Sequence, residues 1–328
     1  MIITQKAILV NSKKFDNWNM KKELNIQMAD KLKNAGLTKR AERMSECSKE
    51  ITIKLCPDCG RYEITKAKLC RDRLCPVCSW RLSLKRYSEM MNVSKDIITE
   101  YPNNQWSFMS LTVQNCAPDK LDYVLNKMSE AFNRMRQRKI YKEDILGWAR
   151  TVEVTFNKED NTLHPHYHVL LIWNKNVNVL HQGARLLNHW VASVKDLIVS
   201  IKAQNIEDIY NKDKADYDVK GEEKADIDVT KAVLETFKYT QKASQALYMP
   251  TSIFYQYAQN IARKRTVSYG GLIKKQMKKL HYNINDNMPD TVEDMFICKN
   301  CGSTSLSEAL YKWSFAERSY LLSPQNVE

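Results

Sequence analysis

The side chains best suited to chemistry are three histidines at alternating positions. His164, His166 and His168 lead into a short apolar run, a pattern that predicts a β-strand. Residues two apart on a strand point to the same side, so the imidazoles of His166 and His168 lie about 7 Å apart along one face. Two imidazoles in this arrangement can bind one divalent ion. His164 either joins them as a ligand or only begins the strand.

Glu153 is the expected third ligand of such an ion. Two strand-like segments flank a turn-forming stretch around Asp160, which predicts an antiparallel hairpin. In that hairpin Glu153 falls opposite His166 and His168, on the face away from its apolar neighbours. Mixed nitrogen and oxygen ligands that leave positions open suit Mg²⁺ or Mn²⁺ and the oxygens of a phosphate. The alternative is that the histidines share a surface by coincidence and bind nothing.

A second candidate group is a glutamate and a tyrosine one helical turn apart. Glu235 and Tyr239 share a helix face, and Lys238 and Lys242 form another such pair beside them. The cations favour the ionised tyrosine, which can attack a phosphate, and the carboxylate can accept a proton from a hydroxyl or water. The same spacing is common on solvated helices, so it gains weight only beside the metal site.

The cysteines predict structural zinc. Six of the nine form CxxC pairs: Cys56 and Cys59, Cys75 and Cys78, Cys298 and Cys301. The first two pairs are 15 residues apart with Cys70 between them, a spacing typical of a closed four-thiolate site without a catalytic position. Cys47 lies nearby, so more than four ligands are available. Reactive or disulfide-bonded thiols are the alternative, and the third pair either completes a second site or binds nothing.

The charge balance points to a polyanionic partner. Lys and Arg number 51 against 38 Asp and Glu, a formal charge of +13. Nucleic acid is the first expectation and an acidic membrane surface the second. Two basic stretches, 61–86 and 263–279, are suited to contact phosphates, although such runs are more often solvated surfaces. The candidate DNA contacts are Arg81, Lys85, Arg86, Lys238, Lys242, Arg263, Lys264, Arg265, Lys274 and Lys275.

Local patterns predict the elements that must position these groups. The most strand-like part, 106–175, contains a strand, an amphipathic helix and the hairpin with the histidines. Helices are expected at 1–55, 79–98, 181–205 and 229–262.

Two further features bound the class of protein. Residues 207–228 hold nine acids against four lysines, which indicates an exposed and partly disordered insertion. The longest apolar run, 169–173, is far too short to span a membrane, and the N-terminus has no secretory signal. We therefore expect no membrane partner and a reducing cytoplasm, where cysteines bind metal rather than form disulfides.

Five segments together resemble the replication initiators of small rolling-circle plasmids, members of the HUH endonuclease superfamily: LCPVCSWR, SFMSLTVQNC, VEVTFNKEDNTLHPHYHVLL, ETFKYTQK and SYGGLIKK. They lie within residues 70–275. The histidine motif alone recurs in relaxases and some transposases. The glutamate–tyrosine pair and the cysteine knuckle narrow the resemblance to the plasmid initiators of Gram-positive type.

The resemblance implies a metal-dependent nickase that acts on the plasmid double-strand origin. Tyr239 would attack a phosphodiester in single-stranded origin DNA, giving a 5′-phosphotyrosyl bond and a 3′-hydroxyl that host polymerase extends. The ion held by His166, His168 and Glu153 would polarise the scissile phosphate. Glu235 would act as the base at termination. Family members act as oligomers and recruit a host helicase in the bacterial cytoplasm.

The implied fold is α+β, a central antiparallel sheet flanked by helices, with a cysteine-rich zinc module and helical extensions. The corresponding segments are a helical N-terminal region at 1–55, a zinc-knuckle DNA-binding module at 56–100, the endonuclease domain at 101–282 and a C-terminal region at 283–328. Two rival functions stay open. A zinc-dependent repressor would bind DNA without cutting it, and a transposase or mobilisation relaxase would cut other DNA by the same chemistry.

Overall fold

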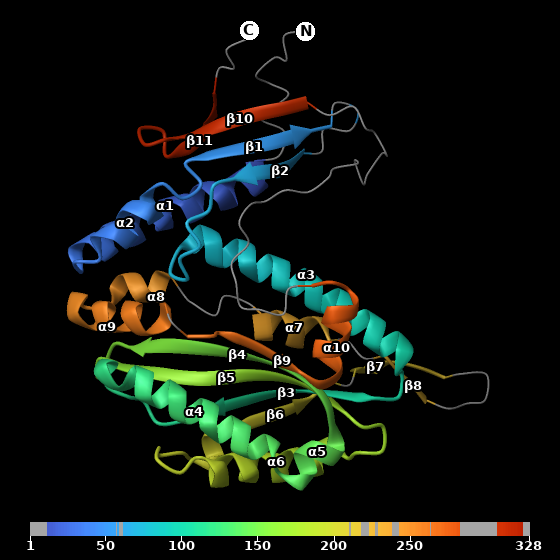
Figure 1. The fold of residues 1–328 in the computed structure, drawn as a ribbon. Coiled ribbons are helices and arrows are strands. Elements are labelled where there is room, and N and C mark those ends of the chain that lie inside the picture. Colours follow the sequence, from blue (N-terminus) through green and yellow to red (C-terminus); the bar gives the residue numbers. More distant parts are fainter. Residues whose placement is uncertain are drawn as a thin grey trace. The chain divides into compact units, whose positions relative to one another are not determined.

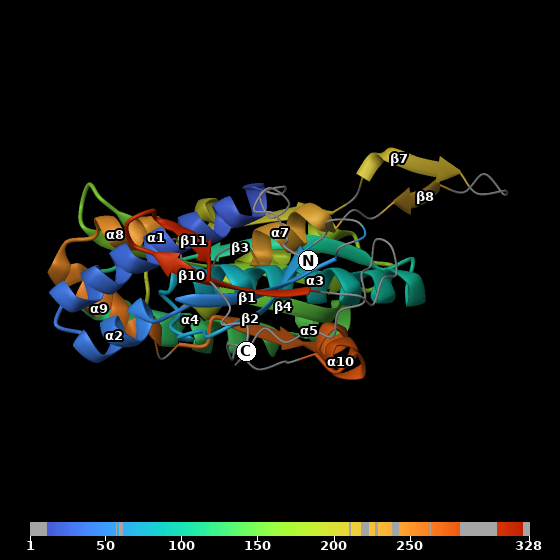
Figure 2. The same cartoon turned by 90° about the horizontal axis from the view of Figure 1, so that it is seen from above.

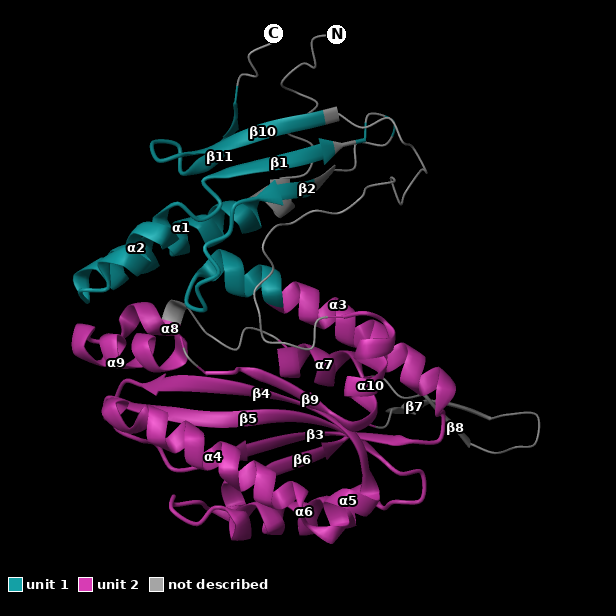
Figure 3. Ribbon diagram, in the orientation of Figure 1, with its two compact units in different colours: residues 1–82, 288–328 teal, residues 83–287 magenta. Residues whose placement is uncertain are grey.

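Two compact units divide the chain, 1–82 together with 288–328, and 83–287 (Figure 3). The computed structural model describes residues 12–56, 58, 62–209, 211–217, 223–226, 229–237, 243–262, 264–282 and 307–323. This division differs from the four predicted segments, because a strand from the C-terminal region pairs with one from the N-terminal region. The N-terminal region, residues 56–82 of the cysteine-rich module and residues 288–328 therefore build one unit.

The first unit is an antiparallel sheet with helices from the N-terminal region (Figure 1). Its described elements are α1 (Ser12–Asn34), α2 (Thr38–Ser45), β1 (Glu50–Leu55), β2 (Tyr62–Ala67), the start of α3 (Pro76–Glu100), β10 (Ser307–Ser314) and β11 (Ser319–Leu322). The strand order is β11-β10-β1-β2. Trp18 of α1 is buried and meets the rings of Trp80 and Tyr320 edge-on at 5.3 and 6.4 Å. This aromatic contact joins α1 to α3 and to the sheet.

The second unit is a five-stranded antiparallel sheet with helices on both faces. Its described elements are the rest of α3, β3 (Gln105–Thr112), η2 (Pro118–Lys120), α4 (Leu121–Arg136), α5 (Lys139–Asp144), β4 (Ile145–Asn157), β5 (Thr162–Trp173), α6 (Val179–Ser193), η3 (Ile201–Ala203), β6 (Asn205–Asp208), β7 (Asn211–Tyr217), β8 (Glu223–Asp226), α7 (Thr230–Phe237), α8 (Ala243–Tyr248), α9 (Thr251–Ala262), β9 (Val267–Gly270) and α10 (Gly271–Lys279). The sheet order is β6-β3-β5-β4-β9. The predicted α+β class, with antiparallel sheets flanked by helices, is confirmed.

The two faces of this sheet are covered by different helices (Figures 1 and 2). On one face, Trp106, Ala149 and Leu170 are buried in a core shared with α7, α10 and the second half of α3. The other face packs against α4 and α6. There the guanidinium of Arg150 lies between the rings of Phe132 and Tyr167, at 4.6 and 4.4 Å. Burying Tyr167 on this face turns the alternating histidines to the other.

Several expected elements need correction at their ends. The helix expected at 181–205 ends at Ser193, where the backbone becomes extended, and only the short η3 follows. The acid-rich segment 207–228 contains the end of β6 and the paired strands β7 and β8 in its described residues. Among the described residues, no helix combines the length and apolar composition that a membrane span requires.

Candidate functional site

The predicted carboxylate and imidazoles meet on the sheet. β4 and β5 pair in a register that sets Glu153 directly opposite His166, as the predicted hairpin requires. The Nε2 atoms of His166 and His168 lie 3.2 and 3.0 Å from Oε2 of Glu153. Glu153 is buried, whereas the histidine side chains keep 15% and 14% of their surface exposed. The three groups therefore converge at a point that solvent can reach.

The spacing of these atoms fits a divalent ion. The three ligand atoms lie within 4.8 Å of one another. Two ligands at right angles around an ion with bonds of about 2.1 Å stand about 3 Å apart, close to the separations of His166 and His168 from Glu153. One carboxylate and two imidazoles leave the remaining positions of an octahedral ion for water or phosphate oxygens. The donor set thus suits the predicted Mg²⁺ or Mn²⁺.

Neighbouring side chains hold the two imidazoles in place. Nδ1 of His168 lies 3.5 Å from Oγ of Ser110 on β3, and its ring stacks on Phe108 with centroids 5.4 Å apart. Nδ1 of His166 faces the main-chain oxygen of His164 at 3.4 Å. Because Nδ1 is turned toward these partners in both rings, Nε2 is the nitrogen presented to an ion.

His164 lies beside this group but has other partners. Its Nδ1 is 2.7 Å from Oδ1 of Asn115, and its Nε2 is 2.9 Å from Oγ1 of Thr112. Burial and the nearby His166 lower the pKa of His164, which favours its neutral ring. In this conformation neither ring nitrogen of His164 is directed to the ion site.

Glu235 lies on a helix that covers the same face of the sheet as the metal group. α7 packs against β4 and β5, and its Val233 and Phe237 share a buried core with Leu170, two residues beyond His168 on the same face. Glu235 is half-buried near the C-terminal end of this helix. Tyr239, the predicted nucleophile, follows α7 by two residues and lies outside the described residues.

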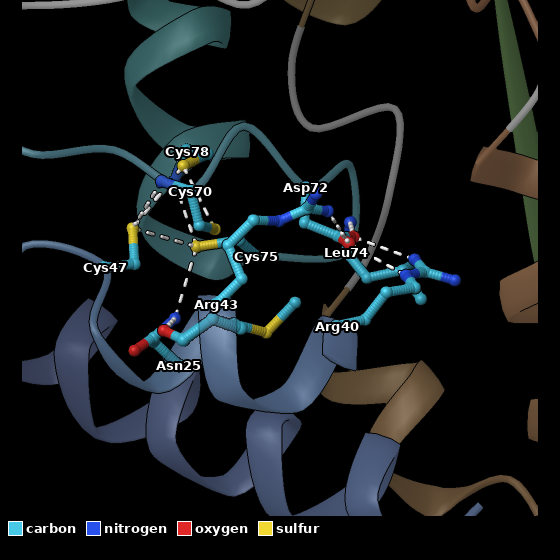
Figure 4. A network of polar contacts seen from close by, with 10 residues as sticks. Asn25, Arg40, Arg43, Cys47, Cys70, Asp72, Leu74, Cys75 and Cys78 are labelled. Atoms are coloured by element: carbon cyan, nitrogen blue, oxygen red, sulfur yellow. Dashed lines mark hydrogen bonds and ion pairs between the residues drawn. The ribbon is translucent and has the colours of Figure 1, made fainter. Parts of the chain in front are cut away.

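The first unit contains a second group of converging ligands, four buried cysteines (Figure 4). Sγ of Cys47 lies 3.5 Å from Sγ of Cys78 and 3.6 Å from that of Cys75, and Cys70 lies 3.7 Å from Cys78. Tetrahedral zinc with bonds of about 2.3 Å holds its sulfurs about 3.8 Å apart, so the four atoms fit that ion. Hydrogen bonds from the other thiols lower the pKa of Cys47, whereas burial raises that of Cys75.

This cluster differs from the predicted set of Cys56, Cys59, Cys75 and Cys78, because Cys47 and Cys70 lie beside Cys75 and Cys78 and Cys56 does not. β1 runs away from Cys47 at about 3.3 Å per residue, which carries Cys56 about 20 Å to the far end of the strand. β2 then returns, so the amide of Ser48 donates to the main-chain oxygen of Lys68 at 2.7 Å and Cys70 comes back beside Cys47. Cys56 is buried at the other end of the hairpin. Cys59, Cys298 and Cys301 lie outside the described residues.

Comparison with known proteins identifies the family. The Rep_1 model, described as "Replication protein", matches residues 61–321. The chain belongs to this replication protein family. A rep protein of Bacillus amyloliquefaciens is 32% identical over 258 residues, 74% of each chain. One from Streptococcus pneumoniae is 28% identical over 281 residues, 83% of this chain and 82% of the relative. One from Lentilactobacillus hilgardii is 27% identical over 317 residues, 93% and 94% of the two chains.

The family match confirms the resemblance to rolling-circle plasmid replication initiators and a role in plasmid replication. No solved structure matches the chain.

The basic residues predicted to contact DNA divide into exposed and engaged ones in this replication protein. Lys274 and Lys275 are exposed on α10, and Lys85 is partly exposed with Glu89 at 3.8 Å. Lys264 instead pairs with Asp122 at 2.8 Å. Three of the remaining arginines contact other parts of the protein or are buried. Arg81 lies over the ring of Trp18, Arg86 is buried, and Arg265 donates to the main-chain oxygen of Val267. Arg263, Lys238 and Lys242 lie outside the described residues.

Proposed function

We propose that this replication protein nicks one strand of its plasmid double-strand origin, using Tyr239 as the nucleophile beside the ion site of Glu153, His166 and His168. The observation that supports the proposal is that α7 and the three ligands share one face of the sheet. Phe237 ends α7, and Tyr239 follows it by two residues in the sequence. A nucleophile on this side of the sheet has a short path to a phosphate at the ion.

The nicking step exchanges one phosphate ester for another. The phenolic oxygen of Tyr239 forms a bond to phosphorus, the bond from phosphorus to the 3′ oxygen breaks, and the departing 3′ oxygen takes up a proton. Glu153, His166 and His168 would hold Mg²⁺ or Mn²⁺, which would supply a Lewis acid for the scissile phosphate. The phenol gives up its own proton, and the flanking Lys238 and Lys242 favour the phenolate. The products are a 5′-phosphotyrosyl bond and a free 3′-hydroxyl that host polymerase extends.

Termination needs a second activated hydroxyl, for which we propose Glu235. While Tyr239 is esterified it cannot attack again, so a water or a terminal hydroxyl must do so. The carboxylate of Glu235, one helical turn from Tyr239 in sequence, would accept the proton of that hydroxyl. Glu235→Ala then keeps initial nicking but yields longer or multimeric products.

Structural zinc is the proposed role of the cluster of Cys47, Cys70, Cys75 and Cys78. Four thiolates close the tetrahedron, which leaves no position for a substrate. The ion would supply cross-linking of the chain, and the cysteines would hold the loop that leads into α3.

Origin DNA would be bound with help from the exposed Lys274 and Lys275, and a host helicase and a second copy of the chain are proposed partners.

A second zinc site is proposed at the other end of the β1–β2 hairpin. Leu55 pairs with Tyr62 and also with Ser307, so β1 ends where β2 and β10 begin, at the same end of the sheet. Cys56 and Cys59 follow β1, and Cys298 and Cys301 precede β10. Metal analysis of the purified chain would give two zinc ions per molecule, and one after Cys298→Ser with Cys301→Ser. A single zinc ion in the unaltered chain contradicts this site.

The decisive test of the proposed function is cleavage of supercoiled origin DNA with Mn²⁺. The wild type should give nicked circles and a DNA adduct on Tyr239, and Tyr239→Phe should give neither. Tyr248→Phe, which alters an exposed tyrosine of α8, is the matched control and should nick normally. Nicking by Tyr239→Phe, or none by the wild type, overturns the proposal. The second outcome favours a DNA-binding repressor.

A further inference from the structure

One lysine of α1 is wholly buried against the four-cysteine cluster. Lys22 has 0% of its surface exposed. Its ammonium donates to Oδ1 of Asn25 at 3.2 Å, to the main-chain oxygen of Ser45 at 3.0 Å and to that of Cys47. These three acceptors match the three protons of an ammonium. The position of Lys22 is therefore fixed by polar contacts with the segment that enters the cluster.

Asn25 contacts the cluster itself. Its side-chain nitrogen donates to Sγ of Cys75 at 3.2 Å and to the main-chain oxygen of Met44 at 3.0 Å (Figure 4). Asn25 and Lys22 are three residues apart on one face of α1, and the amide oxygen that accepts from Lys22 leaves the amide nitrogen directed at the sulfur. One helix thus provides two adjoining contacts to the metal-binding segments.

The charge of a loaded zinc site accounts for a buried ammonium at this place. A buried cation is costly unless nearby negative charge offsets it. Four thiolates around one Zn²⁺ carry a net charge of about −2. The loaded cluster therefore stabilises the ammonium.

We propose that Lys22 and Asn25 are positioning residues of the four-cysteine metal site, so that zinc binding and the docking of α1 are one coupled event. The inference rests on the zinc role proposed above. Coupling of this kind is reciprocal: losing the α1 contacts weakens zinc binding, and removing zinc weakens the docking of α1.

The first test measures zinc affinity of the full chain by competition with a chromophoric chelator. Lys22→Met should bind zinc 10- to 100-fold more weakly, the range found when outer partners of a metal site are removed. Lys33→Met is the matched control, because Lys33 is an exposed lysine of the same helix, and it should stay within twofold. Asn25→Ala should shift the thiolate-to-metal absorption band of the Co²⁺-substituted protein, whereas Lys33→Met should not. Unchanged affinity in Lys22→Met overturns the inference.

The second test uses the unaltered chain, so it does not depend on whether a variant folds. Amide hydrogen exchange of α1 is compared before and after zinc is removed by a chelator. The amides of α1 should lose protection together with those around Cys70 and Cys75. If α1 stays protected while the cysteine segments open, the coupling is wrong although the zinc role stands. If the purified chain takes up no zinc at the cluster, the zinc role itself fails and the inference with it.

Discussion

The two candidate metal groups of this replication protein contrast in ligand chemistry and in access. The first unit gathers four sulfurs that are all buried, whereas the second gathers one carboxylate and two imidazoles that are partly exposed. Four thiolates close the coordination shell of zinc, while three nitrogen and oxygen ligands leave room for a substrate oxygen. These differences match the two proposed roles, in which the four-cysteine cluster holds the chain together and the group of Glu153, His166 and His168 acts on a ligand.

The groups also differ in how the chain assembles them. Glu153, His166 and His168 come from two adjacent strands, so their approach follows from sheet register. Cys47 and Cys70 come together only because the β1–β2 hairpin leaves and returns. The assembly of Glu153, His166 and His168 follows from the pairing of two adjacent strands. The assembly of the cysteines depends on how the whole β1–β2 hairpin folds.

The largest expected effect is a loss of stability when the four-cysteine cluster, called here the closed group, is changed. Cys75→Ser should lower the free energy of unfolding of the first unit by more than about 3 kcal/mol, because losing a structural zinc site removes much of the folding free energy that the metal provides. Thermal denaturation and zinc content measure this effect.

The matched control for that change is Cys116→Ser in the second unit. Cys116 is also buried but belongs to neither candidate metal group of the described residues. It should leave zinc content unchanged and cost about 1 kcal/mol or less. A Cys75→Ser protein that stays fully folded although its four-cysteine cluster holds no zinc would break the comparison, since that cluster would then not stabilise the unit.

The next largest effect is a loss of cleavage when the group of Glu153, His166 and His168, called here the open group, is changed. Glu153→Gln removes the charged ligand but keeps an amide of the same shape beside the imidazoles. Cleavage of a single-stranded origin oligonucleotide should fall at least about 100-fold, equivalent to roughly 3 kcal/mol of lost transition-state stabilisation. The thermal midpoint and zinc content should stay close to those of the wild type. If Glu153→Gln cleaves as fast as the wild type at saturating Mn²⁺, the carboxylate of Glu153 is not a ligand that cleavage requires.

The same difference in assembly explains which site residues the sequence could predict. Alternation along β5 and a turn near Asp160 were enough to predict that Glu153 faces the histidines, because a strand has a period of two and register fixes the partner. Nothing local marks Cys47 as a ligand, since its partners are 23 or more residues away and are brought back by β2. Lys22 was missed for the same reason, because a lysine in a polar helix has no local sign of burial. Tyr239 lies outside the described residues, so its role stays a prediction.

The Gly270–Gly271 pair of the SYGG motif is a further feature whose role the sequence alone could not assign. A Cβ on Gly270 would come within 2.1 Å of Trp148, and Gly271 has a φ of +56° that favours glycine. The motif therefore has a packing reason in β9 and α10, which a sequence pattern alone could not separate from phosphate contact.

A smaller effect distinguishes the histidines on the metal face. His164→Gln should cost about 1–2 kcal/mol of stability, through the hydrogen bonds to Thr112 and Asn115, and should leave cleavage within about threefold of wild type. His166→Gln should instead lower cleavage about 100-fold. Oligonucleotide cleavage and thermal denaturation of both variants provide the comparison. Equal loss of cleavage in the two would make His164 a third imidazole ligand and enlarge the open group.

The smallest effect sharpens the difference between a buried thiol and metal-bound thiolates. Burial, helped by Asp119, raises the pKa of Cys116 to about 11, so its folded-state thiol stays protonated at pH 8 and becomes reactive only as the pH nears that value. Iodoacetamide at pH 8, followed by peptide mass mapping, should leave Cys116 unmodified in the folded protein. The cluster cysteines should be protected while zinc is bound and become modified once it is removed. Modification of the cluster in zinc-loaded protein at the rate of the zinc-free form would show that no metal shields those sulfurs, and the contrast between a closed and an open group would lose its basis.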